Sequence, residues 1–180
     1  MLGTGIIKGL YITAKNFVGT YFNPDERLTT LQYPEEAACI PENYRNFPFL
    51  IYDGSDPVEG LRCVACKMCE NECPPRCISI VAERDEKGKI LKRPRVFELD
   101  ISVCMGCGIC AEVCPFDSIK MDHHFEIATA ERFDSLRLNL PQLAKSNEYF
   151  RKTHPIDALA VDTKRAEKAN KAASKTQSPA

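Results

Sequence analysis

Eight cysteines in two equally spaced groups constrain the fold of this chain more than any other feature. The second group follows the first by 41 positions, and each group reads C-x2-C-x2-C-x3-C-P. The first group is Cys63, Cys66, Cys69 and Cys73, and the second is Cys104, Cys107, Cys110 and Cys114. Pro74 matches Pro115, and Ile78 matches Ile119. An internal repeat of this kind predicts two similar halves.

The spacing within each group favours an iron–sulfur cluster. Three cysteines at three-residue intervals let a tight loop wrap one face of a cubane and offer a thiolate to three of its irons. In two-cluster ferredoxins the fourth cysteine of each run ligates the other cluster. We therefore assign one 4Fe–4S cluster to Cys63, Cys66, Cys69 and Cys114. The second 4Fe–4S cluster takes Cys104, Cys107, Cys110 and Cys73.

Structural zinc is the alternative for so many clustered cysteines. Zinc sites take four ligands, usually from two C-x2-C pairs, and a triple run closed by Cys-Pro fits that pattern poorly. Ten cysteines in 180 residues are also too few, and too clustered, for a disulfide scaffold. In a reducing compartment, cysteine is expected to bind metal or to act in catalysis.

Residues beside the cysteines suit a cluster environment. Gly106 and Gly108 lack side chains, so backbone N–H groups can approach the sulfurs, and Pro74 and Pro115 fix φ where the chain leaves each motif. Apolar neighbours should exclude water and help to set the potentials. They are Val64, Ile78, Ile80, Ile109, Val113, Phe116 and Ile119. Without clusters the chain is not expected to hold its fold.

Two cysteines and two histidines stay outside these ligand sets. Cys77 aligns with Ser118 in the repeat, so we interpret Cys77 as a small residue near a cluster and not as a ligand. Cys39 stands alone, and we expect a buried thiol. His123 and His124 are adjacent and should point in different directions, so polar surface or partner contact is expected and a shared metal is not.

The segments before the second motif have distinct patterns. Residues 1–24 carry apolar residues at helical spacing and only two charges, which predicts a basic amphipathic helix. Such a helix docks on a membrane interface or a partner, or packs on its own domain. Residues 25–47 are Pro-rich and predict an extended connector. Residues 48–121 hold the dicluster domain. Within this part of the chain we expect strands over 47–52, 78–83 and 90–99, and a short helix beginning in the last turn of each motif.

The C-terminal region is less regular. Residues 122–160 predict a partner-contact segment with a helix over 136–150, and residues 161–180 predict a disordered basic tail. The whole pattern predicts an α+β fold, a ferredoxin-like two-cluster pseudo-dimer with an N-terminal amphipathic helix and irregular extensions.

Several other classes of protein are excluded by what the sequence lacks. Hydrophobic residues make up 44% and charged residues 27%, with a formal net charge of −1, which is ordinary for a soluble or peripheral protein. We find no membrane span and no secretory signal. There is no G-x-G-x-x-G between a strand and a helix and no nucleophile–base pair, so we expect this chain to relay electrons while another chain does the substrate chemistry. No nucleic-acid partner is expected.

Segments outside the cysteine motifs resemble a known family. Residues 30–36, with Tyr-Pro-Glu-Glu, and residues 41–45 resemble the connector in subunit I of NADH–quinone oxidoreductase, respiratory complex I. Residues 9–15 of the leader, residues 62–69 after an Asp-Gly turn, and Phe125-Glu126 are similar to the same family. The likeness covers roughly residues 5–130, while Cys104-Met-Gly-Cys107, Cys77 and the C-terminal region depart from the family pattern.

The resemblance implies an electron relay in a peripheral arm. The subunit would accept electrons from the upstream iron–sulfur subunit, which receives them from NADH, and pass them to the terminal-cluster subunit that reduces quinone. Its leader would rest on the quinone-site membrane subunit and the membrane surface, at the cytoplasmic side of a bacterial inner membrane. The absence of a transit peptide favours a bacterial origin.

Three alternatives stay open: the dicluster subunit of a related membrane hydrogenase or formate hydrogenlyase, a diffusible two-cluster ferredoxin, and a zinc-stabilised interaction module. Residues 1–60 argue against the diffusible carrier, because a carrier needs no docking leader.

Overall fold

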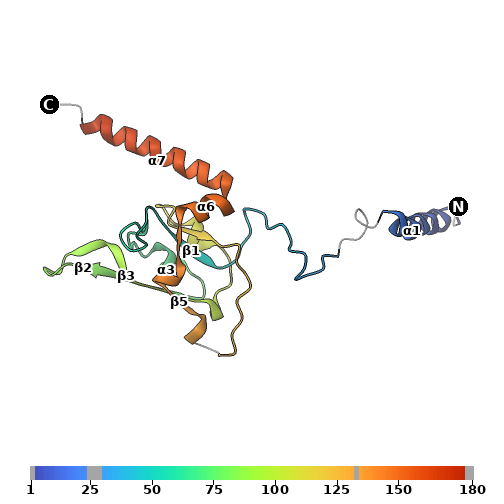
Figure 1. The fold of residues 1–180 in the computed structure, drawn as a ribbon, viewed down its shortest axis with the longest axis horizontal. Coiled ribbons are helices and arrows are strands. Elements are labelled where there is room, and N and C mark those ends of the chain that lie inside the picture. The colour runs from blue at the N-terminus through green and yellow to red at the C-terminus, as the bar shows by residue number, and fades with distance from the viewer. Residues whose placement is uncertain (1–2, 24–29, 132–133, 177–180) are drawn as a thin grey trace. The chain divides into compact units, whose positions relative to one another are not determined.

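The computed structural model describes residues 3–23, 30–131 and 134–176, which belong to two compact units. The first unit ends at Cys39 and contains α1 (Thr4–Phe22); the second begins at Ile40 and contains the cysteine motifs (Figure 1). The predicted connector is therefore divided, because residues 40–47 belong to the second unit. Residues 24–29 lie outside the described part of the chain.

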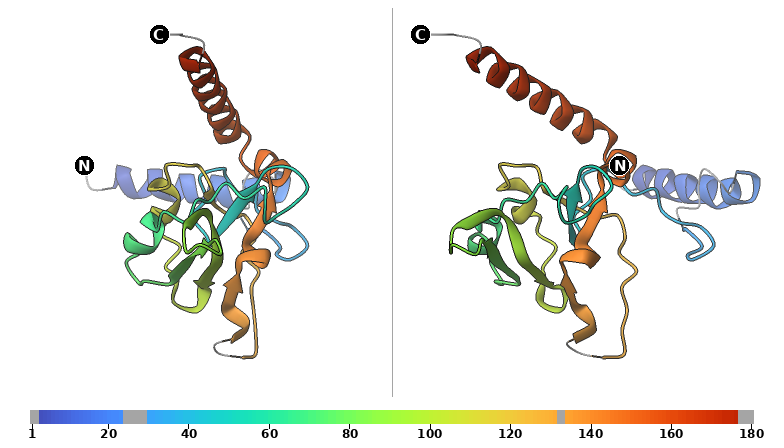
Figure 2. Two further views of the ribbon diagram at one scale, coloured as in Figure 1. Left: turned by 90° about the vertical axis from the view of Figure 1, so that its left-hand side faces the viewer. Right: turned by 60° about the vertical axis from the view of Figure 1, so that its left-hand side comes forward.

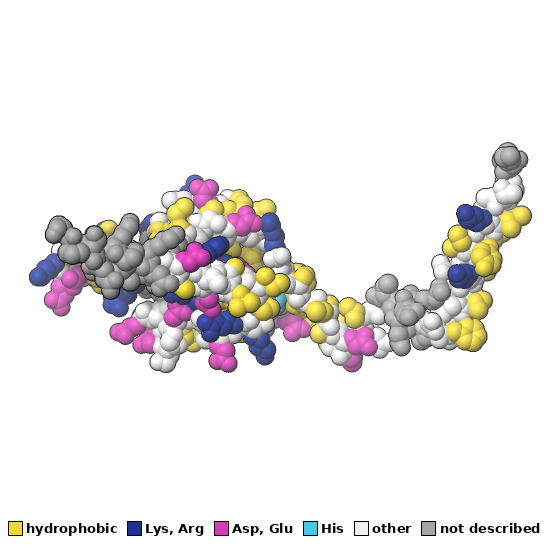
Figure 3. All heavy atoms as spheres, turned by 90° about the horizontal axis from the view of Figure 1, so that it is seen from above, with side chains coloured by type: hydrophobic (Ala, Val, Ile, Leu, Met, Phe, Trp, Pro, Cys, Tyr) yellow, Lys and Arg dark blue, Asp and Glu magenta, His cyan; other side chains and the backbone are white. Residues whose placement is uncertain are grey.

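Helix α1 confirms the N-terminal helix that the apolar spacing predicts. None of its described side chains is buried, and apolar side chains and two basic ones lie along it (Figure 3). Lys8 and Lys15 are seven residues apart, so they lie on the same side of the helix. At 100° per residue, Ile6, Leu10, Phe17 and Tyr21 lie opposite the two lysines. Ile7, Tyr11, Val18 and Phe22 widen this apolar stripe on one side as far as the lysines, and all eight side chains are exposed. Within the described residues, no helix has the length and apolar character needed to span a membrane.

Two three-stranded sheets interlock the two halves of the repeat. β1 (Pro48–Tyr52) lies between β4 (Ile119–Met121), which is antiparallel to it, and β6 (Ala144–Ser146), which is parallel. β3 (Ile90–Asp100) lies between β2 (Ile78–Arg84) and β5 (Arg137–Asn139), both antiparallel. Figure 1 shows β2 and β3 side by side as a hairpin. Each sheet thus pairs a strand from before one motif with a strand from after the other. The three predicted strands and the α+β fold class are confirmed.

Each cysteine motif contains one turn of helix. α3 (Met68–Asn71) carries Cys69, and α4 (Ile109–Glu112) carries Cys110, so each helix holds the third cysteine and ends before the fourth. A short 3-10 helix, η1 (Ile101–Val103), leads from β3 into the second motif and is capped by the Asp100 carboxylate.

Strand β1 is buried on both faces and separates two hydrophobic cores. Successive side chains of a strand point to opposite faces, which explains the unbroken apolar run of this segment. Leu50 packs into the larger core with the cysteines, whereas Phe49 and Ile51 pack into a smaller one. The remaining buried residues of the smaller core are Phe150, Ala158 and Val161.

The helix predicted over 136–150 is wrong. This region contains η2 (Asp134–Leu136), β5, α5 (Leu140–Leu143), β6 and α6 (Asn147–Thr153). Asn139 and Gln142 form a capping box that starts α5, with Pro141 in its first turn, where a proline is tolerated. The flanking tripeptides pair with β3 and β1, so sheet pairing replaces a continuous helix.

The disordered tail predicted from residue 161 is also wrong as far as residue 176. Helix α7 (Pro155–Thr176) begins one residue after α6 and extends away from the two sheets (Figure 2). Ala158 and Val161 on its first turns are buried against β1 and α6, with Val161 only 1% exposed. This anchor and a run of strong helix formers explain the helix. Residues 177–180 of the predicted tail lie outside the described part.

Candidate metal centres

Each predicted set of four cysteines is brought together around its own cavity. One cavity is lined by Cys63, Cys66, Cys69 and Cys114, and the other by Cys73, Cys104, Cys107 and Cys110. In both, the fourth cysteine comes from the opposite half of the repeat. The matching sets of cysteines indicate that the two halves build equivalent sites.

The backbone around the two cavities repeats as faithfully as the cysteines do. Three equivalent positions in each copy have left-handed φ values. They lie two residues after the first cysteine, one residue after the second cysteine and three residues after the fourth. They are Ala65, Lys67 and Arg76 in the first copy, with φ of 55°, 63° and 53°, and Gly106, Gly108 and Asp117 in the second, with 61°, 80° and 49°. Four of these six residues are not glycine, so the chain accepts backbone strain of about 1–3 kcal/mol at each one to form these loops.

Backbone N–H groups point at two of the sulfurs. Gly106 N donates to Cys104 Sγ at 3.5 Å, and Ser118 N donates to Cys114 Sγ at 3.4 Å. The backbone N–H of Gly106 therefore approaches a sulfur, as we predicted. A Cβ at Gly106 would lie 3.3 Å from the Asn46 carbonyl oxygen, so close packing as well as positive φ requires glycine here.

Arg45 holds the second loop in a way that the sequence did not predict. Its Nη1 donates to the carbonyl oxygen of Cys107 at 2.7 Å, and its Nη2 donates to Glu112 Oε1 at 2.9 Å. Asn46 beside it donates to the His124 carbonyl oxygen at 2.7 Å. The only sequence signal for this contact is the pair of glycines, Gly106 and Gly108, in the loop under these side chains.

The bare thiols are hard to ionise. Burial, followed by the neighbouring thiolate of Cys63, raises the pKa of Cys69 to about 12. Burial, followed by the neighbouring thiolate of Cys104, raises the pKa of Cys110 to about 12, and burial also raises the pKa of Cys63. Because metals bind thiolates, a cation in either cavity must displace these protons and balance the crowded negative charge.

A fifth sulfur lies at the second cavity. Cys77 is buried, its Sγ is 3.4 Å from Cys73 Sγ, and it lines the cavity with the four predicted ligands. Ser118 has the equivalent place at the first cavity, where it is 2% exposed. Both residues therefore lie beside a cavity, and the interpretation of Cys77 as a small residue that is not a ligand stays a prediction.

Cys39 and the two histidines that the sequence analysis left outside the ligand sets do not line either cavity. Cys39 is exposed, so the buried thiol that we predicted is wrong: it belongs to the short stretch before Ile40, where no core residue covers it. His123 and His124 have different surroundings. The ring of His123 packs against that of His154 at 4.9 Å between centroids, while His124 is exposed.

An ion pair with a buried arginine lies directly before the first cysteine motif. Arg62, directly before Cys63, donates from Nε and Nη2 to the two Asp53 carboxylate oxygens at 2.9 and 2.7 Å. Arg165 of α7 donates to the same carboxylate at 2.9 Å. Burial alone would raise the pKa of Asp53, but the two guanidinium groups outweigh it and lower the pKa. Asp53 follows β1, so this carboxylate joins β1, the first motif and α7.

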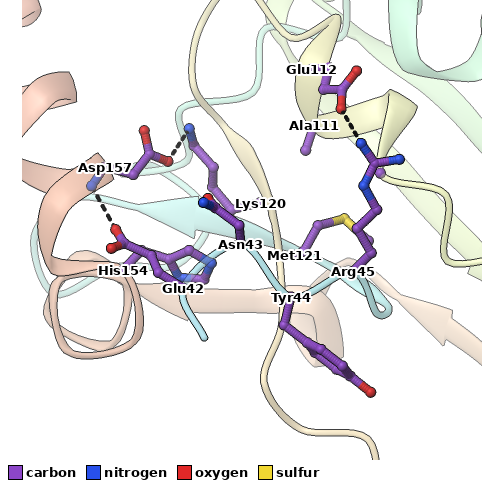
Figure 4. A pocket seen from close by; sticks show the side chains of 11 residues that line it. Glu42, Asn43, Tyr44, Arg45, Ala111, Glu112, Lys120, Met121, His154 and Asp157 are labelled. Carbon is purple, nitrogen blue, oxygen red and sulfur yellow. Dashed lines mark hydrogen bonds and ion pairs between the residues drawn. The ribbon is translucent and has the colours of Figure 1, made fainter. Parts of the chain in front are cut away.

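Charged side chains that pair with one another line a surface cleft of the second unit. Figure 4 shows Lys120 beside Asp157 and Arg45 beside Glu112 at this cleft. Lys120 Nζ lies 2.6 Å from Asp157 Oδ2, and Glu42 Oε1 accepts from the Asp157 backbone N–H at 2.6 Å. These charges pair with one another, so the cleft ties α7 and residues 42–45 to β4.

The residues at the two cavities fit 4Fe–4S clusters better than zinc. In a tetrahedral zinc–thiolate site the sulfurs stand about 3.8 Å apart, as follows from Zn–S bonds of about 2.3 Å. Cubane ligands bind four different irons and stand further apart. Over the described ranges, no three His, Cys, Asp or Glu side chains surround the position of a single metal ion. The buried Ser118 hydroxyl, which lies beside the Cys63 sulfur, also finds an acceptor if a cluster fills the first cavity.

Comparison with known proteins gives consistent results. Residues 62–118 match the family model described as 4Fe-4S dicluster domain, so two 4Fe–4S clusters are the cofactors of this chain. A protein of Geobacter metallireducens named NADH-quinone oxidoreductase subunit I 2 is 36% identical over 130 residues, which cover 72% of this chain and 88% of the relative. A protein of the same name from Streptomyces coelicolor is 31% identical over 140 residues, 72% of this chain and 62% of the relative.

A solved structure is also similar. A chain of the membrane-bound sulfane sulfur reductase, an archaeal respiratory membrane complex, aligns with a TM-score of 0.44 and 21% identity. The alignment covers 74% of this chain and 66% of that one.

Proposed function

Since this chain belongs to the subunit I family of NADH–quinone oxidoreductase, we propose that it relays single electrons through two 4Fe–4S clusters within that membrane-associated complex. The resemblance stated from the sequence is thereby confirmed at the level of the family. The observation that carries the proposal is the pair of equivalent four-thiol cavities, one in each half of an interlocked repeat. A bound 4Fe–4S cluster supplies reversible one-electron chemistry, and we assign the substrate chemistry to other subunits.

The proposed ligands are Cys63, Cys66, Cys69 and Cys114 for one cluster and Cys104, Cys107, Cys110 and Cys73 for the other. The apolar walls exclude water: Ile80 and Phe97 line the first cavity, and Leu99 and Met121 line the second. Backbone N–H groups of Gly106 and Ser118 offset negative charge on two of the ligand sulfurs. Holding the sites in one core makes them rigid, which limits reorganisation when charge changes.

Each proposed cluster has an apolar rim where a partner can approach. Met68 and Phe116 line the first cavity and are exposed, and Met105 lines the second and is exposed. A relay needs separate contacts for its donor and its acceptor. We assign these rims to the upstream iron–sulfur subunit and the terminal-cluster subunit, in an order to be determined by mutation.

Helix α1 is the proposed attachment to the membrane arm and the quinone-site subunit, at the cytoplasmic side of the inner membrane. Its exposed apolar side and its two lysines suit an interface between apolar material and anionic headgroups. The combined change Leu10→Glu and Phe17→Glu should release the chain from membranes in cell fractionation. Asn16→Glu, on the polar side, is the control for adding an acidic side chain to this helix. A chain that is monomeric and free of membranes before any mutation would overturn the relay in favour of a diffusible carrier.

Iron analysis tests the ligand sets separately from attachment. Anaerobically purified protein should contain about eight irons with equal sulfide. Cys63→Ser or Cys104→Ser should each remove one cluster, lower the iron toward about four, and disrupt assembly with partner subunits. Cys39→Ser should change neither quantity, because Cys39 lies outside both cavities. One or two zinc ions in place of iron would refute the proposal.

A further inference from the structure

The two repeated sites differ at the position four residues after the exchanged cysteine. The fourth cysteine of the first motif is followed by Cys77 and that of the second by Ser118. A left-handed residue precedes each, Arg76 with φ 53° and Asp117 with φ 49°. The carbonyl of Cys77 accepts from Asp100 N at 2.9 Å, and that of Ser118 accepts from Ile51 N at 2.8 Å. Both residues are therefore fixed by the same turn and by a strand of the other half.

At the second cavity this position places a thiol against a ligand sulfur. Cys77 Sγ is 3.4 Å from Cys73 Sγ, and Cys77 is only 7% exposed. When Cys73 binds iron as a thiolate it has no proton to donate. The proton between the two sulfurs then belongs to Cys77, which donates a weak S–H hydrogen bond to the cluster ligand.

At the first cavity the same position places a hydroxyl. Ser118 Oγ is buried, and the one hydrogen-bond acceptor beside it within the described residues is the sulfur of Cys63. Ser118 lines the cavity with Cys63, Cys66, Cys69 and Cys114. A buried donor costs free energy unless something accepts from it, and the sulfurs around this cavity are the acceptors that a bound cluster presents.

We propose that Cys77 and Ser118 are matched hydrogen-bond donors that set the reduction potentials of the two clusters apart. This inference rests on the ligand sets proposed above. Reduction adds one negative charge to a cluster, so a donor to its sulfurs favours the reduced form and raises the potential. A hydroxyl is a stronger donor than a thiol. The cluster beside Ser118 is therefore raised more by this position than the cluster beside Cys77.

Redox titration of the cluster-loaded full chain, followed by EPR, tests the proposal. Cys77→Ser should raise the potential of one cluster only, and Ser118→Cys should lower the potential of the other only. The expected change in the ratio of reduced to oxidised cluster at fixed potential is up to about tenfold, which equals about 59 mV for one electron. Ser118→Ala should lower the same potential as Ser118→Cys by at least as much. Ser79→Ala, exposed on β2, is the control and should move neither potential.

Iron content distinguishes this inference from the ligand assignment. If Cys77→Ser keeps about eight irons and both potentials stay unchanged in every variant, the donor role is wrong while the ligand sets stand. If Cys77→Ser loses a cluster, Cys77 is itself a ligand, and both the donor role and the assignment of Cys73 are wrong. Because Ser118 variants change no thiol, they test the donor role even if a Cys77 variant fails to fold.

Discussion

Replacing Asp53 by Asn removes the negative charge from a buried ion pair while the side chain keeps its size. Asp53 accepts two hydrogen bonds from Arg62, whose side chain is 3% exposed, and one from Arg165, whose side chain is 48% exposed. Nη1 of Arg62 is already without a partner within the described residues. After the substitution, Arg62 would be a buried cation with no counter-charge beside it.

The magnitude follows from this unequal burial. Breaking a fully buried ion pair costs about 3–5 kcal/mol, because a charge stays behind without compensation. Asp53 is 35% exposed, so water replaces part of the lost interaction, and we expect a loss of about 2–3 kcal/mol. For a domain of this size that loss lowers the apparent Tm by about 4–12 °C. Arg165→Gln breaks only the exposed half and should cost at most about 1 kcal/mol.

The assay is anaerobic thermal unfolding of the cluster-loaded chain, followed by circular dichroism at one scan rate. Arg62→Met combined with Asp53→Asn should be less destabilised than Asp53→Asn alone, since no buried charge remains. If Asp53→Asn lowers the apparent Tm no more than Arg165→Gln does, the buried pair does not hold the first motif in place. Because the folded pKa of Asp53 is lowered, its contribution is present above the unfolded value and is lost as the pH falls through the folded one.

Two further predictions concern the smaller core. Burial, assisted by the nearby His123, lowers the pKa of His154, so the folded chain keeps this ring neutral; stability should fall as the pH drops below about 6.5, where the unfolded ring takes up a proton. His154→Phe should flatten this dependence when the apparent Tm is compared at pH 7.5 and 5.5, and an unchanged slope would assign it to other groups. Phe150→Ala should lower the free energy of unfolding by about 3–5 kcal/mol, since the ring is fully buried against β1 and α7. Its iron content should match that of the unchanged chain, because Phe150 contacts the core that lacks cysteines, and a loss below about 1 kcal/mol would show that this core collapses around the gap.

The sequence predicts the centre of this molecule better than its edges. The repeated cysteines, the strands that flank them and the glycines at positive φ all follow local rules, because the spacing around a cubane leaves few backbone solutions. Even so, Ala65, Lys67 and Arg76 have the same left-handed backbone without being glycine, so residue type alone did not reveal the full loop geometry. The contact of Arg45 with the Cys107 carbonyl joins residues 62 positions apart and has no local signal.

The failures at the C-terminal side have two different physical causes. Between residues 136 and 150 a single helix does not form, because pairing with β1 and β3 satisfies the backbone of the tripeptides on either side of α5. From residue 161 onward the absence of aromatic residues suggested disorder. Alanine and lysine are nevertheless strong helix formers, and the burial of Ala158 and Val161 anchors the helix they form.

The interlocked strands have a consequence for how this protein is made. β1 pairs with β4, whose residues follow it by about 70 positions, and the cavity beside Cys63 is not complete without Cys114. A nascent chain that has left the ribosome only as far as β2 has neither a finished sheet nor a finished set of four thiols. Iron delivered at that stage would meet three cysteines and open solvent. Loading must therefore wait until the second motif and β4 have emerged, so both sites become complete only late in synthesis.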